Sequence, residues 1–172
     1  MAAGTLLLLL AAAVVVPLFG LSRLLGARGY EFRLAALGLA VPGLMLMAPE
    51  LDQAYATITA SALYLGLRGL RTPYPASGGL WAADAGAALA LGIFYSWGLA
   101  VLLPALALLA LVGAVGSRKM LFATGPPDAS RVSWPHLAAW AAGLLAGMAL
   151  VLSLLEALAP FDLPAIFQHN SS

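Results

Sequence analysis

With 172 residues, of which 63% are hydrophobic and only 9% charged, the chain has too few charges to cover a water-soluble domain, in which about 25% of residues are charged. A formal net charge of +1 excludes a strongly basic nucleic-acid-binding protein, and the lack of cysteine excludes disulfides, thiolate zinc sites and iron–sulfur clusters. We therefore predict a single all-α domain over residues 1–172. It is a polytopic transmembrane helix bundle in the lipid bilayer, and its Ala, Gly and Leu richness indicates a bacterial inner-membrane protein.

The first apolar run, near residues 5–21, is predicted to be a retained membrane span. No basic residue precedes this run, the Pro-Leu-Phe sequence at 17–19 is a poor signal-peptidase site, and Arg23 and Arg28 follow it. Arginines that flank a span tend to stay in the cytoplasm. We therefore expect the N-terminus to lie outside.

The charges between the later apolar segments determine the predicted topology. Loops that carry Arg or Lys alternate with loops that carry acids or no charge, as expected for six spans that obey the positive-inside rule. Both termini then lie outside, and the stretches 71–79 and 117–135 are turn-rich loops. The spans are predicted near residues 5–21, 34–48, 54–67, 80–97, 99–116 and 137–159.

The apolar stretch 80–116 has two possible interpretations, one long helix or two short ones. A single helix would be about 55 Å long, whereas the hydrocarbon core is about 30 Å thick. It would also place Arg71 and Arg118 on opposite sides of the membrane. We therefore predict a tight hairpin near Trp97 and Gly98, where glycine favours a turn.

The third predicted span carries a polar stripe. Its members recur every three or four residues, so they share one face of a helix. That face must point to the protein interior or to a watery cavity, because polar groups find no partners in hydrocarbon. It either makes interhelical hydrogen bonds, each worth about 0.6 kcal/mol, or lines a pathway. The stripe consists of Gln53, Thr57, Ser61, Tyr64 and Arg68.

Asp84 is an acidic residue near the predicted cytoplasmic start of the fourth span. Ala88, Gly92 and Ser96 follow at four-residue steps, which places the carboxylate on a small-residue face that another helix can approach. An aspartate at mid-membrane costs about 2.5–3.5 kcal/mol on insertion scales. Asp84 is thus either an ion or proton site, or an N-terminal helix charge one turn inside the headgroups that the helix dipole stabilises.

The sixth predicted span carries a packing motif and one acid. Ala139, Gly143 and Gly147 form a run of small residues typical of close helix–helix contact. Glu156 lies in the last turn, where the dipole disfavours a carboxylate, so we expect it to reach water or a partner. Acidic residues on the same side of the membrane, which is predicted to be the exported side, could bind a divalent metal together with His169. Contact with water also accounts for their presence there.

The segment 160–170 reads PFDLPAIFQHN. It is similar to the apolar-then-His-Asn opening of the last span in seven-helix membrane hydrolases of the alkaline ceramidase-like superfamily. The resemblance implies an N-out seven-span protein in which a serine, an aspartate and three histidines hold zinc. It assigns His169 as a metal ligand and expects a seventh span after Ser172. Zinc is therefore expected only if the chain is such a hydrolase, and the sequence indicates no other cofactor.

Three classes of function remain. The first is a non-enzymatic helical bundle or accessory subunit, with a partner membrane subunit or a second copy of the chain. The second is a small-solute, ion or proton conduit that uses the polar third span and Asp84. The third is the ceramidase-like metal hydrolase. The first is favoured because the sequence contains no complete catalytic constellation, and no catalytic residue is assigned.

Overall fold

The computed structural model describes residues 9, 12–26, 29–33, 36, 52–95, 97–115 and 132–158, and within these ranges every regular element is a helix. The all-helical class predicted from the sequence is therefore confirmed for this part of the chain. The predicted second span near 34–48 lies outside the described residues apart from Ala36, and so does the segment 159–172 with His169.

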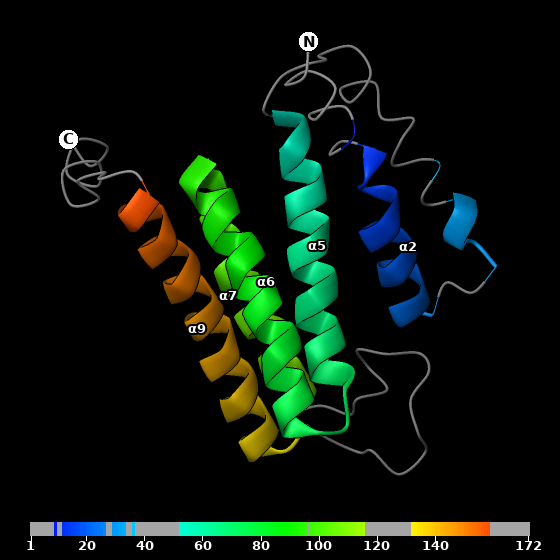
Figure 1. Cartoon of the computed structure of the whole chain (residues 1–172). Coiled ribbons are helices and arrows are strands. Elements are labelled where there is room, and N and C mark those ends of the chain that lie inside the picture. The colour runs from blue at the N-terminus through cyan, green and yellow to red at the C-terminus, as the bar shows by residue number, and fades with distance from the viewer. Residues whose placement is uncertain are drawn as a thin grey trace.

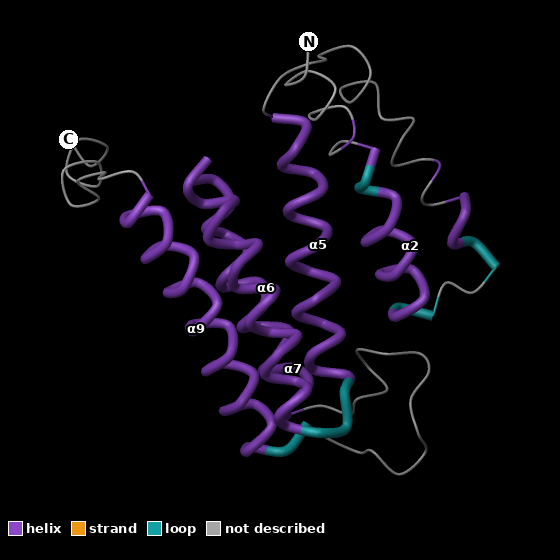
Figure 2. The backbone as a smooth tube through the Cα atoms, in the orientation of Figure 1, coloured by secondary structure: helices purple, strands orange, loops and turns teal. Residues whose placement is uncertain are grey.

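Four of the helices stand in a row, and a fifth lies behind them. Figure 1 shows α9 beside α6, α6 beside α5 and α5 beside α2, with α7 behind α6. The tube in Figure 2 follows α2 and α5 in one direction and α6 and α9 in the opposite direction. In chain order the elements are α2 (Val15–Leu24), α5 (Asp52–Arg71), α6 (Pro75–Tyr95), the 3₁₀ helix η1 (Trp97–Val101), α7 (Leu102–Val115) and α9 (Trp134–Leu158).

The contact between α6 and α9 is a contact between backbones. A Cβ atom added at Gly143 would overlap the carbonyl oxygen of Gly79, and one added at Gly147 would overlap that of Ala83. Added at Gly86, it would overlap the carbonyl oxygen of Leu144. Small residues on both helices thus let the two backbones touch, which is how helices associate where water supplies no hydrophobic driving force.

Within the apolar stretch 80–116, α6 is followed by η1 and α7, and the chain reverses its direction between α6 and α7 (Figure 1). The α6 helix ends at Tyr95, and η1 begins at Trp97, where the hairpin was predicted. Beyond the turn, the Leu99 side chain lies against Gly92, and Leu106 packs against Gly66 in the C-terminal half of α5. The backbone N–H of Val132 then donates to the carbonyl of Gly113 over 3.1 Å. The end of α7 therefore lies beside the segment that leads into α9.

The outer surface of the described bundle is strongly apolar. Leu80, Leu108 and Leu150 are each more than 60% exposed, and monomeric soluble proteins rarely expose such continuous apolar surface. By length and composition, three helical segments can cross a membrane: Pro75–Phe94, Gly98–Val115 and Trp134–Leu158. These exposed apolar faces are compatible with a lipid environment.

Candidate functional site

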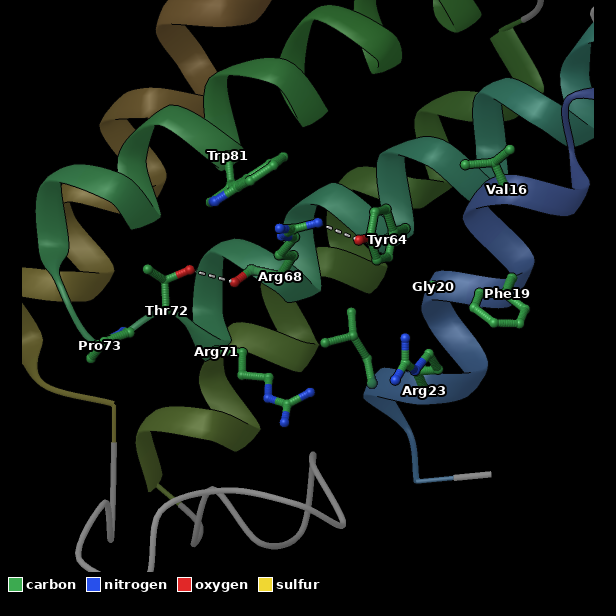
Figure 3. Close-up of a pocket in the computed structure, with 11 residues that line it drawn as sticks. Val16, Phe19, Gly20, Arg23, Tyr64, Arg68, Arg71, Thr72, Pro73 and Trp81 are labelled. Carbon is green, nitrogen blue, oxygen red and sulfur yellow. Dashed lines mark hydrogen bonds between the residues drawn. The ribbon is translucent and has the colours of Figure 1, made fainter. Parts of the chain in front are cut away.

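A cavity of about 670 Å³ lies between α2, the C-terminal half of α5 and the first turns of α6. Three arginines and three aromatic residues line it, and none of its described lining residues is acidic. Figure 3 shows Arg23 on α2 and Arg68 beside Tyr64 on α5, with Arg71 further toward the end of α5. The aromatic members are Phe19, Tyr64 and Trp81.

The wall of the cavity on α2 depends on close contact between α2 and α5. A Cβ atom added at Gly20 would lie within 2.7 Å of ring atoms of Tyr64, so the absence of a side chain on α2 admits the tyrosine ring. Phe19 and Arg23 are four residues apart and share one helix face. The guanidinium carbon of Arg23 lies 5.7 Å from the centroid of the Phe19 ring.

Arg68 is held by two aromatic side chains, Tyr64 and Trp81. Its Nη1 donates a hydrogen bond to the Tyr64 hydroxyl over 2.5 Å, and its guanidinium carbon lies 3.9 Å from the centroid of the Trp81 ring. Cation–π contact of this kind restrains the guanidinium plane without using its N–H donors. Arg68 and Arg71 also lie in the last turn of α5, where the helix dipole favours positive charge.

The end of α5 near this cavity is fixed by a proline and by two side chains of α9. The carbonyl of Gly69 has no donor four residues later, because Pro73 lacks a backbone N–H. The Nε2–H of His136, a residue only 1% exposed, donates to this carbonyl over 2.9 Å. One turn away, Trp140 Nε1–H donates to the carbonyl of Gly66, also over 2.9 Å. These two bonds join α9 to α5.

No protein-family model, curated protein or solved structure matches this chain.

The polar stripe of α5 leads toward the cavity, but only its C-terminal part lines it. Tyr64 and Arg68 are cavity residues, whereas Ser61 and Thr57 lie half-buried further along the helix. Thr57 has a partner of its own. The side chain of Gln53 lies outside the described part of the structure.

Asp84 does not join the stripe in one site. The α6 helix begins at Pro75 rather than near residue 80, so Asp84 lies nine residues after the start of the helix, further from its N-terminus than the predicted span placed it. The carboxylate is exposed, on the same outward face as Leu80 and Leu91. Gly92, which was predicted to share a helix face with Asp84, points inward instead, against Ile58 and Leu99.

The other predicted site residues lie apart from the cavity. Glu156 is exposed near the C-terminal end of α9, whereas Gly143 and Gly147 face α6, and Ala139 packs beside Gly79. Across the described ranges no three His, Asp or Glu side chains lie close enough to share a metal ion.

Sequence reasoning overlooked His136 and Trp140. The sequence offered two weak signals of their contact with α5. His136 and Trp140 are four residues apart and so share one helix face, and α5 has small residues at Gly66 and Gly69, followed by Pro73.

Proposed function

We propose that this chain is a non-enzymatic six-span helical bundle that serves as an accessory subunit of another membrane protein. The observation that carries the proposal is the position of Asp84. It lies nine residues after Pro75, which is about 14 Å along the helix, or nearly halfway across a hydrocarbon core of about 30 Å. An aspartate in contact with lipid at this depth is costly, and a partner helix that donates to it removes the cost.

The packing of the buried face supports a structural role. The α6 and α9 backbones touch through Gly79, Gly86 and Gly143, and the hydrogen bonds of His136 and Trp140 tie α9 to α5. Buried polar groups here hold helices together. The face of α6 that remains without a helix in the described bundle is the one with Asp84.

The proposed topology has six spans and an external N-terminus. Arg23 at the end of α2 and Arg68 and Arg71 at the end of α5 gather at one cavity, so both arginine-bearing ends lie at the same end of the bundle. The C-terminal end of α2 and the N-terminal end of α5 lie at opposite ends of the bundle (Figure 1). A span near 34–48 would join them. The positive-inside rule then assigns the arginine end to the cytoplasm.

Single cysteines test the topology, because the natural chain has none. Tyr74 is 72% exposed at the arginine end and Leu158 is 82% exposed at the far end of α9. We expect a membrane-impermeant maleimide to label Leu158→Cys in intact cells and Tyr74→Cys only after permeabilisation. Labelling of Tyr74→Cys in intact cells would reverse the assigned orientation.

Photo-crosslinking in native membranes tests the accessory role. A photoreactive amino acid at Leu91, on the face of Asp84, is expected to give a discrete adduct with a membrane span of a different protein. Its partner peptide should carry a basic or hydrogen-bond-donating side chain within the span. The same probe at Leu150, exposed on α9, is the matched control and is expected to react with lipid.

Substitution of the carboxylate completes this test. Asp84→Leu should reduce the adduct several-fold, whereas Glu156→Gln, which changes an exposed acid at the end of α9, should leave it intact. An adduct within one chain, an adduct between two copies of this chain, or lipid adducts alone at Leu91 would each contradict an accessory subunit.

A further inference from the structure

We propose that the arginine-lined cavity binds the phosphate of an anionic glycerophospholipid. The first reason is charge. Arg23 and Arg68 place two guanidinium groups along one space, and none of its described lining residues is a carboxylate. Arg71, the third arginine of the lining, has an interaction of its own. Like charges brought together in this way repel one another unless an anion lies between them. Planar guanidinium groups with several N–H donors match the oxygens of a phosphate.

The second reason is that the central arginine is held in position before a ligand arrives. The Trp81 ring and the Tyr64 hydroxyl restrain the Arg68 guanidinium. Only one of its five N–H donors is needed for the tyrosine, which leaves the others for an anion. Restraint of this kind lowers the entropy lost on binding.

The third reason is the shape of the cavity, which joins a cationic end to an apolar one. Its lining extends along α2 from Arg23 to Val16, a separation of seven residues or about 10 Å. Val16 is 71% exposed. A free phosphate ion would occupy only the arginine end of a cavity of about 670 Å³. A phospholipid places its phosphate among the arginines and an acyl chain beside Val16.

The fourth reason favours an anionic headgroup over a zwitterionic one. The face of Trp81 that could receive a choline group is already covered by Arg68. A quaternary ammonium would also lie next to three arginines. Basic pockets between membrane helices at the headgroup level commonly select anionic lipids in this way.

Lipid binding to the purified full chain in detergent, followed by native mass spectrometry and thermal unfolding, tests the proposal. We expect dioleoylphosphatidylglycerol to bind at least about tenfold more tightly than dioleoylphosphatidylcholine. Inorganic phosphate and glycerol 3-phosphate, at the same concentrations, should neither bind measurably nor raise the melting temperature. Equal binding of the two lipids would overturn an anion-selective cavity, and a soluble phosphate that binds as tightly as the lipid would overturn the lipid assignment.

Charge-removing variants locate the site. Arg23→Gln should weaken phosphatidylglycerol binding about fivefold, and Arg23→Gln with Arg68→Gln by about twentyfold or more. Arg33→Gln is the matched control, because Arg33 is exposed, lies over the Tyr30 ring and does not line the cavity. Since Arg23 is exposed, its variant carries the test even if loss of Arg68 impairs folding. An equal loss of affinity in Arg33→Gln would show general charge attraction and overturn the site.

Discussion

Replacement of Gly147 by leucine is expected to abolish accumulation of the folded protein, and replacement by alanine to destabilise it by about 2–3 kcal/mol. Even a Cβ atom at this position would overlap the carbonyl oxygen of Ala83 on α6. A backbone carbonyl cannot rotate away as a side chain can, so the two helices must separate. Separation would also open the neighbouring contact between Gly143 and Gly79.

The neighbouring residue supplies the control for this prediction. Ala146 precedes Gly147 on α9 and is exposed, so Ala146→Leu adds the same side chain on the side away from α6. We expect it to leave the melting temperature of the detergent-purified protein within a few degrees of the natural chain. The measurement is thermal unfolding with size-exclusion chromatography. Equal behaviour of Gly147→Leu and Ala146→Leu would show that the α6–α9 contact does not hold the bundle together.

The helices and the turn at Trp97 could be predicted because they depend on local sequence and on membrane thickness. Apolar blocks separated by charges predict helices, and a stretch far longer than the membrane is thick must fold back. The start of α6 was misplaced for a physical reason. Pro75, Gly78 and Gly79 are residues typical of loops, yet Pro75 occupies the first turn of a helix, where proline is tolerated. The two glycines serve contacts with other helices, Gly78 with His136 and Gly79 with Ala139.

The cavity could not be predicted because its members come from distant parts of the chain. Arg23 and Arg68 line one cavity because Gly20 lets α2 approach Tyr64 on α5, and no pattern within either helix specifies that approach. The outward position of Asp84 could not be predicted either, because it also depends on contacts between helices that are distant in the sequence. Hydropathy predicts that α6 crosses a membrane, but only its contacts with α5 and α9 decide which of its faces remains open.

His136 is expected to stabilise the bundle far more than an ordinary hydrogen bond between membrane helices. Such bonds average about 0.6 kcal/mol, because the separated helices find other partners. The carbonyl of Gly69 has no alternative partner within α5, since Pro73 cannot donate to it. His136→Leu therefore leaves a buried acceptor unsatisfied, which costs about 1–3 kcal/mol, and the missing imidazole also disturbs the packing against Gly78.

A double-mutant cycle with Pro73→Ala isolates this contribution. Alanine at position 73 restores a backbone N–H four residues after Gly69, so α5 can satisfy its own carbonyl. His136→Leu should then destabilise the Pro73→Ala protein by at least about 1 kcal/mol less than it destabilises the natural chain. Trp140→Phe is the control, because the carbonyl of Gly66 has the N–H of Leu70 as an intrahelical donor. The changes in the free energy of unfolding caused by Trp140→Phe and by Pro73→Ala should therefore be additive. Unfolding measurements give the coupling energy of each residue with Pro73. If these energies are equal for His136 and Trp140, the Gly69 carbonyl does not depend on α9 because of Pro73.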